Sequence, residues 1–599
     1  QNAGANAYNV AVGYQAGAAI TTSVRTIAVG GLAADGYDTE NDNLAIGHAA
    51  LGGAVAGGEY NVAVGNYTLD ALTSADHCTA VGYQAGSAKT SGNHGTFIGY
   101  NAGLSCTTGT DVTFVGSEAG DGHDTESYNT GIGSGALGGP IAGGEYNVAV
   151  GAYTLDALTS GDSNVAIGYV AGSAITTGSN NTALGANALQ SNTTATRNTA
   201  IGKGSMNSTT TGLANTAIGF ESMVSHTEGN SNVAVGAYAL DALTTGGDNI
   251  GIGSQACGGF DTETANLGIG TSALGGSIAG GEYNVAIGNS TLDALTSADQ
   301  CVAVGYNAGS AVTEASGFTG VGFEAGLSTT TGQDNVYMGK TAGRGNTTGG
   351  RNIALGFASI YNADTESNNL AVGYNALGGS VAGGEYNVAV GNNNLSALTS
   401  GDNNVAVGYG AGLSITTGEG NICIGEQAGH NGTALTTGDN NIFIGEKINA
   451  GGAGNHRQIV IGTEGTTGKG DNTTFISANG GTSFNGANTT TWDQASDRRI
   501  KKNIVDNNTG LEAINKIQVR NFEYRTLEEI TDFDSPEAAM VDKQGTQLGA
   551  IAQEIEEILP DLITETSQGV KTLNADNLTW YLINAVKELS AEIKVLKGE

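Results

Sequence analysis

The stretch SDRRIKKNI, residues 496–504, concentrates reactive side chains that the rest of the chain lacks. It places four of the protein's 22 basic residues within five positions, two residues after a serine, although the formal net charge is −35. A serine hydroxyl becomes a nucleophile only where a base removes its proton, and a lysine can be that base when burial or neighbouring cations lower its pKa well below ~10.4. Taken alone, the spacing of Ser496 and Lys501 favours a plainer interpretation, a solvated basic patch facing an acidic protein.

Most of the acidic charge lies upstream of this stretch. Residues 1–495 hold 10 Lys and Arg against 38 Asp and Glu, a net charge of −28. Residues 496–599 hold 12 against 19, a net charge of −7, and the two parts sum to −35. So acidic a chain repels phosphate backbones, which argues against nucleic-acid binding. No apolar run approaches the roughly 18–20 residues that span a bilayer, so we expect no membrane insertion.

The composition excludes the usual glycine-rich classes of protein. Glycine numbers 99 and proline only 3, without a Gly-X-Y triplet, so the chain is not collagen. Aliphatic residues recur too regularly for a structureless linker. The cysteines show no CxxC spacing and occupy small-residue positions, which favours packed free thiols over disulfides or a metal site, and we expect no cofactor. The five cysteines are Cys78, Cys106, Cys257, Cys301 and Cys423.

A motif of 17 residues fills most of the chain. "NVAVG" at 9–13 returns as "NLAIG" at 43–47 and "NVAIG" at 164–168, and the motif closes on a glycine 27 times, the last being Gly462. The step between closing glycines is 17 residues, apart from four steps of 18 and one of 20. Because no single coil can bury its apolar residues alone, this period predicts a mainly β protein, with stacked β-solenoid coils over residues 1–465. Neighbouring strands lie about 4.8 Å apart, so 27 coils predict a rod on the order of 130 Å long.

Each position of the motif predicts a structural role. The residue before the closing glycine is aliphatic in all 27 copies, and the residue two positions earlier is usually Val, Thr, Ile or Leu. Both lie on one side of a strand, so we expect them to point into the core. Between them stands Ala, Gly or Cys in 22 copies, which predicts close packing on the opposite face; the exceptions are Phe97, Phe114, Tyr337, Phe443 and Val460. Asn leads 20 copies and predicts a stacked amide ladder, and the glycine predicts a positive-φ corner or a close backbone approach.

A longer cassette recurs four times on top of the repeat. "GGEYNVAVG" or "GGEYNVAIG" occupies the four coils that hold an eighteenth residue, and "DTE" precedes each cassette. One hypothesis is that the Glu–Tyr pairs of the cassette contact a glycan or protein receptor. The alternative is a β-bulge copied by segmental duplication. The pairs are Glu59/Tyr60, Glu145/Tyr146, Glu282/Tyr283 and Glu385/Tyr386.

The 17-residue period ends after Gly462. Residues 466–495 are a polar Gly/Thr/Asn neck with two short strand candidates around Phe475 and Phe484. Beyond the neck, residues 547–563 have helical apolar spacing and 573–598 predict a terminal helix, so we expect a small α/β domain over 496–599. Apolar residues of the terminal helix step by 4, 3, 4 and 3, which predicts a coiled-coil seam. The seam comprises Leu582, Val586, Leu589, Ile593 and Leu596.

These motifs carry two resemblances to known families. The N-x-A-I-G repeats resemble those of trimeric autotransporter adhesin heads and of phage tail fibres, which implies a left-handed parallel β-roll with three chains side by side. The small-residue face would then be where subunits meet. "SDRRIKKNI", "GAIAQEIEEILP" (549–560) and "NAVKELSAEIKVL" (584–596), in this order, resemble the C-terminal intramolecular chaperone of phage endosialidases and tail fibres over residues 496–599.

The second resemblance implies a self-cleaving domain that brings three chains into register. It implies that Ser496 is the nucleophile, that Lys501 is its general base, and that the bond between Ala495 and Ser496 is cut. Further motif positions are matched by Asp497, Gln553 and Glu554. Identical coils can pair one step out of register at little local cost, which is why such a rod needs a folding template. Release of the template would make disassembly practically irreversible.

Together these features predict a homotrimeric phage tail fibre, made in the host cytoplasm and carried on the virion, that attaches to a host-surface glycan or protein. Other tail proteins would bind through an N-terminal part that these residues do not reveal. Apart from self-cleavage we expect no turnover of an external substrate. One alternative is a tailspike depolymerase, which needs paired carboxylates in a cleft with aromatic platforms. Another is a bacterial trimeric surface adhesin, which needs a membrane anchor or an export signal.

Overall fold

The chain folds into two compact units, Gln1–Gln494 and Ala495–Glu599. Each unit has its own hydrophobic core. The structure is a computed structural model, which describes residues 8–54, 56–277, 279–380, 382–478, 481–485, 498, 501–533, 540–541, 543–566 and 569–598.

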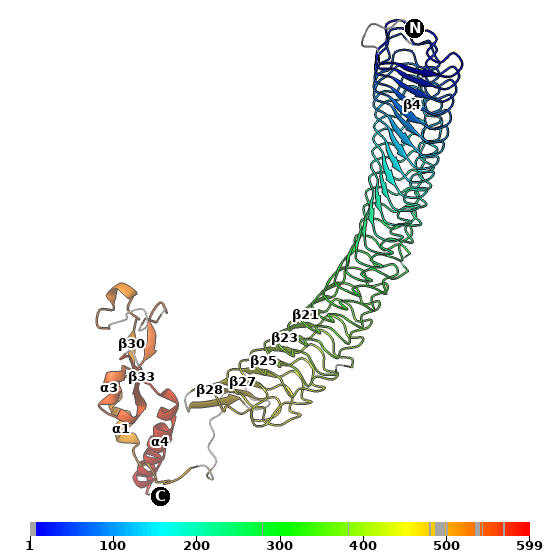
Figure 1. Cartoon of the computed structure of the whole chain (residues 1–599). Helices are drawn as coiled ribbons and strands as arrows, with labels where there is room; N and C mark the ends of the chain where they lie inside the picture. Colours follow the sequence, from blue (N-terminus) through cyan, green and yellow to red (C-terminus); the bar gives the residue numbers. More distant parts are fainter. Residues whose placement is uncertain are drawn as a thin grey trace. The chain divides into compact units, whose positions relative to one another are not determined.

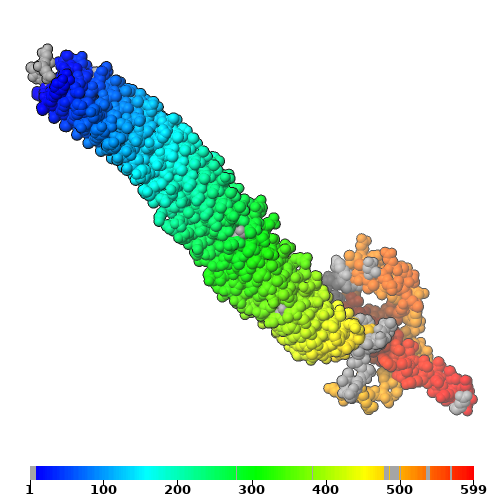
Figure 2. Space-filling view, turned by 90° about the vertical axis from the view of Figure 1, so that its right-hand side faces the viewer, coloured from blue at the N-terminus to red at the C-terminus, as the bar shows by residue number. Residues whose placement is uncertain are grey.

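The first unit is a parallel β-solenoid, as the period predicts. Each of its first 27 strands covers the three residues before a closing glycine, and β27 includes the glycine as well. Each strand pairs in parallel with the next, so that residues one repeat apart lie opposite each other, as Ala166 and Ala183 do. The coil with the 20-residue step keeps this register, with Ile422 opposite Ile442. Stacked in this way, the coils form a gently curved rod (Figure 1), and its surface runs without interruption from coil to coil (Figure 2).

The strands of the rod are β1 (Val10–Val12), β2 (Ile27–Val29), β3 (Leu44–Ile46), β4 (Val62–Val64), β5 (Thr79–Val81), β6 (Thr96–Ile98), β7 (Thr113–Val115), β8 (Thr130–Ile132), β9 (Val148–Val150), β10 (Val165–Ile167), β11 (Thr182–Leu184), β12 (Thr199–Ile201), β13 (Thr216–Ile218), β14 (Val233–Val235), β15 (Ile250–Ile252), β16 (Leu267–Ile269), β17 (Val285–Ile287), β18 (Val302–Val304), β19 (Thr319–Val321), β20 (Val336–Met338), β21 (Ile353–Leu355), β22 (Leu370–Val372), β23 (Val388–Val390), β24 (Val405–Val407), β25 (Ile422–Ile424), β26 (Ile442–Ile444) and β27 (Ile459–Gly462). The sheet continues into the neck, where β28 (Thr474–Ala478) pairs in parallel with β27 and antiparallel with β29 (Gly481–Asn485). The two short strands predicted in the neck are therefore confirmed.

The structure reverses the predicted orientation of the strand faces. In every strand from β2 to β27 the middle residue is buried, whereas its two neighbours are half-buried or exposed. Ala166 is 1% exposed, for example, while Val165 and Ile167 beside it are 38% and 39% exposed. The prediction that the aliphatic pair points into the core is wrong. Leucines of the turns, such as Leu155 and Leu158, already fill the interior of the coil, so the strand can add only one small side chain there.

The five bulky exceptions to the small middle residue also lie inside the rod, and each is fully buried. Phe97 and Phe114 occupy consecutive coils, with ring centroids 6.1 Å apart. Glycine provides the space, because a Cβ atom added to Gly103 would lie 2.3 Å from the ring of Phe97. The small-residue face is therefore enclosed within each chain, and the prediction that subunits meet there is wrong.

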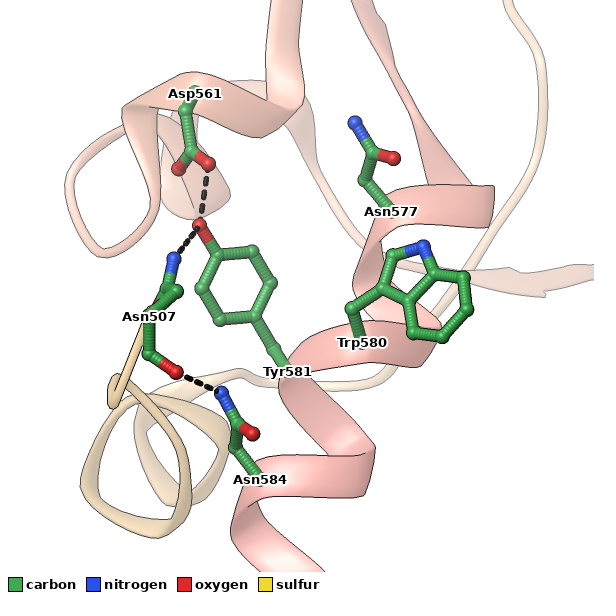
Figure 3. Close-up of a pocket in the computed structure, with 6 residues that line it drawn as sticks. All are labelled: Asn507, Asp561, Asn577, Trp580, Tyr581 and Asn584. Carbon is green, nitrogen blue, oxygen red and sulfur yellow. Dashed lines mark hydrogen bonds between the residues drawn. The ribbon is translucent and has the colours of Figure 1, made fainter. Parts of the chain in front are cut away.

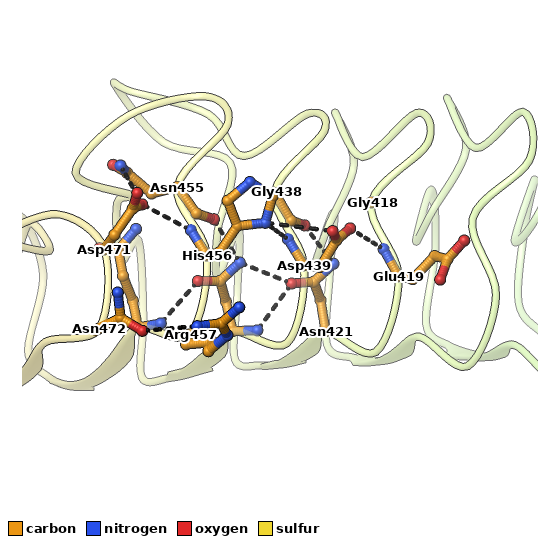
Figure 4. A network of polar contacts seen from close by, with 12 residues as sticks. Gly418, Glu419, Asn421, Gly438, Asp439, Asn455, His456, Arg457, Asp471 and Asn472 are labelled. Carbon is orange, nitrogen blue, oxygen red and sulfur yellow. Dashed lines mark hydrogen bonds and ion pairs between the residues drawn. The ribbon is translucent and has the colours of Figure 1, made fainter.

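The asparagines of the repeat form the predicted ladder along the rod. Asn164 and Asn181 are buried, and Oδ1 of Asn164 accepts hydrogen bonds from the backbone N–H and the side-chain amide of Asn181, at 3.0 and 3.1 Å. Each amide also donates to a backbone carbonyl of the next coil, as Asn421 does to Gly438 at 2.9 Å (Figure 4). The ladder provides partners for polar groups that the stacking buries.

The closing glycines from Gly13 to Gly445 combine a positive φ with a close backbone approach, as predicted. Gly168 has φ +140°, and a Cβ atom there would lie 2.5 Å from the carbonyl oxygen of Gly185 in the next coil. Any side chain at this position would therefore push adjacent coils apart.

Polar side chains enter the core in a few coils. The seventh residue after the closing glycine is a buried leucine in five coils, such as Leu158 and Leu243, but a histidine in two, His123 and His226. Burial lowers the pKa of His123 to about 3 and that of His226 to about 4. The five cysteines are buried and unpaired, which confirms the prediction of packed free thiols.

The second unit combines short helices and strands (Figure 1). β30 pairs antiparallel with β31, and β32 pairs antiparallel with β33. The elements are α1 (Leu511–Lys516), β30 (Arg520–Phe522), η2 (Leu527–Glu529), β31 (Gln547–Gly549), α3 (Ala552–Glu556), η3 (Pro560–Leu562), β32 (Ile563–Glu565), β33 (Lys571–Leu573) and α4 (Ala575–Lys597). The terminal helix is confirmed: the side chain of Asn574 caps the start of α4, and Gly598, with φ +72°, ends it.

The apolar spacing of residues 547–563 suggests one helix, but the structure does not form one there. They begin with β31, continue as the five-residue helix α3 and end with the single turn η3. Pro560 disfavours helical geometry at Leu559, which has φ −138° and ψ 75°. The apolar spacing therefore reflects packing of successive short elements on one core rather than one continuous helix.

We expect acid to destabilise the rod partly through His123. An unfolded histidine titrates near ~6.5, whereas folded His123 stays neutral down to about pH 3, so its contribution to stability is complete above ~6.5 and is lost as the pH falls toward 3. At about pH 4 the loss is on the order of 3 kcal/mol. His123→Leu should therefore reduce the acceleration of guanidinium-induced unfolding between about pH 7.5 and pH 4.

The matched control is His48→Gln, since His48 is exposed on the rod. This variant should keep the pH dependence of the wild type. Equal acid-induced acceleration in the wild type and in His123→Leu would contradict the prediction.

Candidate functional site

The sheet of the rod carries an unpartnered apolar surface, which we call the apolar strip: the outward-facing first and third residues of β1–β27. The third residue is aliphatic in all 27 strands, and the first is aliphatic in all but eight, where it is Thr. With coils about 4.8 Å apart and a strip about 7 Å wide, its area is on the order of 900 Å². Monomeric proteins rarely expose a contiguous apolar patch larger than a few hundred Å². The strip therefore has the properties of an interface.

Helix α4 exposes a second apolar surface. Its predicted seam residues are between 41% and 86% exposed, the extremes being Ile593 and Leu596. A shallow groove on this face is lined by Val586, Leu589, Ser590, Ile593, Lys594 and Lys597. The buried cluster of the second unit is small compared with the core of the rod. It consists of Ala513, Ile555, Leu559, Leu562 and Tyr581. The second unit thus also leaves apolar area for a partner.

A polar pocket of about 190 Å³ lies beside α4 (Figure 3). The hydroxyl of Tyr581 donates to Asp561, which raises the pKa of Tyr581, and it accepts from the side-chain amide of Asn507 at 3.5 Å. Asn584 donates to the backbone carbonyl of Asn507 at 2.7 Å. Trp580 forms one wall of the pocket and is 66% exposed. These bonds tie the start of the unit to its terminal helix.

The same helix fixes α1. The carboxylate of Glu588 accepts a hydrogen bond from the backbone N–H of Leu511, at 2.6 Å, at the N-terminus of α1. A helix N-terminus favours a carboxylate because its first N–H groups have no partners within the helix. Residues 507–511 are therefore held on α4 by polar contacts from residues more than 70 positions away.

Of the residues that the resemblance assigns to self-cleavage, the structure describes Lys501 but not Ser496. Ser496, Asp497 and Ala495 are outside the described residues. Lys501 is exposed, and its backbone N–H donates to the carbonyl of Arg498 at 3.3 Å. The proposed Ser–Lys dyad therefore remains a prediction.

The two other motif positions lie on α3. The side chain of Gln553 is exposed, whereas Glu554 accepts two hydrogen bonds from the guanidinium of Arg520, at 2.9 and 3.2 Å. This pairing raises the pKa of Arg520 and ties α3 to β30. Nothing in the sequence near Glu554 indicates this partner, which lies 34 positions upstream.

The cassette residues predicted to contact a receptor lie on the surface of the rod. The backbone N–H of each glutamate donates to an aspartate of the next coil, as Glu59 does to Asp76 at 2.8 Å. Tyr60 stacks on His77, and Tyr146 on Tyr128, with ring centroids 5.0 and 4.8 Å apart. The side-chain exposures are 50% for Tyr60, 56% for Tyr146, 60% for Tyr283 and 56% for Tyr386.

The glutamate of the "DTE" motif anchors each cassette loop, a role that sequence reasoning missed. Glu40 is 4% exposed and accepts hydrogen bonds at 3.0 Å from the backbone N–H groups of Asp38, Thr39 and Gly57. Glu126, Glu263 and Glu366 make the equivalent bonds. The fixed spacing between "DTE" and the coil with the eighteenth residue could have indicated this role from the sequence.

The described part of the chain contains no group of three or more His, Cys, Asp or Glu side chains arranged to hold a metal ion. Among its helices, none combines the length and the apolar character needed to cross a bilayer.

Comparison with known protein families identifies the C-terminal unit. Residues 496–564 match the family described as the chaperone of endosialidase. The resemblance to these chaperone domains is therefore confirmed for this part of the chain, which carries such a domain behind its β-solenoid. Neither a search of curated proteins nor a search of solved structures gave a match.

Proposed function

We propose that the protein is a homotrimeric phage tail fibre that attaches to the host surface, and that its C-terminal unit directs trimerisation and is released by self-cleavage before Ser496. The observation that carries the proposal is the match of residues 496–564 to the chaperone of endosialidase, directly behind a β-solenoid. A chaperone of this kind implies trimeric assembly.

The exposed apolar surfaces support assembly of several chains. The apolar strip, on the order of 900 Å², is comparable with the ~800 Å² that each partner buries in a standard protein interface. The seam of α4 is exposed in the same chain. An isolated chain would leave both surfaces in water, whereas three chains can bury both at once.

A dedicated template solves a problem that the rod itself creates. Its coils offer nearly the same strip at every step, so two rods can pair one coil out of register at little local cost. The second unit has no repeat, so its surface offers no equivalent position one step away. If three chains first associate through this unit, their rods then pair in a common register.

The rod supports attachment because it is long and presents repeated surface features. Its four cassettes lie at different heights, and each carries an exposed tyrosine above a loop held by a buried glutamate. We propose these Glu–Tyr pairs as contacts for a host-surface glycan or protein.

Self-cleavage is tested by expressing the full chain and running denaturing gels. The wild type should yield a fragment corresponding to residues 496–599, and Ser496→Ala and Lys501→Ala should each abolish it, because the nucleophile or its base is removed. Lys502→Ala, which keeps the proposed dyad, should still be cleaved. A full-length wild-type band, or cleavage of Ser496→Ala, would contradict the assignment.

Trimer formation is tested by light scattering on the uncleaved Ser496→Ala chain. The expected mass is three times 59.7 kDa. Leu589→Asp with Ile593→Asp should reduce the yield of trimer at least tenfold, because two charges enter the seam of α4. Lys587→Glu, at an exposed position outside the seam, is the control. A monomeric Ser496→Ala chain would refute the trimer.

Attachment is tested by binding the purified, labelled fibre to a panel of bacterial cells. Changing Tyr60, Tyr146, Tyr283 and Tyr386 together to Ala should reduce binding to a susceptible strain at least tenfold, while light scattering should show that the variant is still a trimer. Changing four exposed serines of the rod to Ala should leave it unchanged. Binding that survives the tyrosine changes would exclude the cassettes as the contact site.

A further inference from the structure

Two columns of side chains border the apolar strip. The leading column is the residue five positions before each closing glycine, and the trailing column is the residue directly after it. In the coil closed by Gly339 these are Asp334 and Lys340, on either side of β20. Every leading residue has a positive φ between 46° and 70°. The corner is therefore the same in each coil, and the side chains emerge in line.

The trailing column forms a continuous stack over five coils. Tyr306 stacks on Phe323 and Phe357 on Tyr374, each with ring centroids 5.5 Å apart. The ammonium of Lys340 lies between them, 5.7 and 5.8 Å from the centroids of Phe323 and Phe357. Rings stacked along the rod turn their edges outward, so this stack suits packing against a flat neighbour better than stacking on a sugar ring.

The two columns complement each other in size. Phe or Tyr occupies six leading and ten trailing positions, and beyond the first coil no coil has one at both. Tyr146 accompanies Ala152, for example, and Gly317 accompanies Phe323. All of these rings are exposed: Tyr8, Tyr60, Tyr128, Tyr146, Tyr283 and Tyr386 in the leading column, and Tyr14, Tyr83, Tyr100, Tyr169, Phe220, Tyr306, Phe323, Phe357, Tyr374 and Tyr409 in the trailing column.

The columns also complement each other in charge near β20. Asp334 and Lys340 are both exposed, and no ion pair between described residues includes either of them. The strand β20 lies between them, so the two side chains stand on opposite borders of the strip. The next coil carries Arg351 and Phe357, a cation and a ring that can stack. One coil departs from this pattern with Arg197 and Lys203, although the ammonium of Lys203 already lies 5.8 Å from the ring of Phe220 in its own chain.

A threefold arrangement brings these columns together. When three flat strips face a common axis, each strip meets its neighbours along its two borders. Rotational symmetry then sets the leading border of one chain against the trailing border of the next, a heterologous contact that closes after three steps. The strip keeps a width of two side chains through 27 coils, and the surface that matches it over such a length is another copy of the same rod.

We infer that two further copies of this chain cover the apolar strip, with the leading column of each chain packed against the trailing column of the next at the same coil height. The inference rests on the proposed trimer and adds which borders meet and which residues set the register. It places Tyr60, Tyr146, Tyr283 and Tyr386 between chains, so it is an alternative to their proposed role as receptor contacts. Two contacts between neighbouring chains specify the register: Asp334 with Lys340, and Arg351 with Phe357.

The strip itself tolerates displacement by one coil, but the two bordering columns disfavour it in either direction. One direction sets four leading tyrosines against trailing tyrosines, as with Tyr146 and Tyr169, where there is no small residue to receive the second ring. The other direction sets Arg351 against Lys340, two cations. Equal height limits such conflicts to Tyr8 with Tyr14 and Arg197 with Lys203, so the rod itself favours the register that the C-terminal unit starts.

Paired cysteine variants of the full chain test this arrangement. Asp334→Cys combined with Lys340→Cys should give covalent dimers and trimers on denaturing gels, after oxidation or treatment with a short bis-maleimide. Each single variant should give no more than the wild type, whose five cysteines are buried. The register control combines Asp334→Cys with Phe357→Cys, one coil away, and should give at least tenfold less product.

The outcomes separate the inference from the proposed function. A trimer by light scattering in which the Asp334–Lys340 pair does not cross-link would overturn the border contact and leave the trimer standing. Preferred cross-linking of the Asp334–Phe357 pair would overturn the equal-height register. A monomer in solution would remove the proposed trimer and this inference together.

Discussion

The structure depends on the stacking of coils of equal length in register. The three residues of each strand pair with their counterparts in the next coil, and the asparagine before the strand repeats this pairing with its side chain. These bonds satisfy backbone and amide groups that the stack buries, and no coil can make them alone. Where the chain gains residues, it places them in the turns, so that Ile442 still lies opposite Ile422.

The small cross-section of the coil decides what faces outward. Turn leucines such as Leu155 fill the interior, and the strand adds one small residue, so its aliphatic pair is left on the surface. The same geometry repeated 27 times turns two half-exposed side chains into an apolar strip along the rod. The exposed apolar area of one coil is small, but summed over the rod it favours association of chains.

The two units have complementary properties. The rod is long and repetitive, and its strip specifies a partner better than it specifies a register. The C-terminal unit is short and has no repeat, and it binds its own segments through specific contacts such as those of Asp561 with Tyr581 and of Glu588 with Leu511. Under the proposed function, the chaperone-of-endosialidase domain would supply the defined starting point for assembly that the repetitive strip lacks.

The sequence by itself determined the solenoid, its period, the asparagine ladder, the glycine corners, the free thiols and the terminal helix, because each of these follows from residues at fixed local spacing. It did not determine which strand face lies inside. Alternation distinguishes two faces, but whether Ala166 or its neighbours Val165 and Ile167 face the core depends on how the turn residues fill it. The same limit applies to the pairing of Glu554 with Arg520 and to the anchoring of a cassette loop by Glu40. These contacts join residues 34 and 17 positions apart, and only the folded chain brings them together.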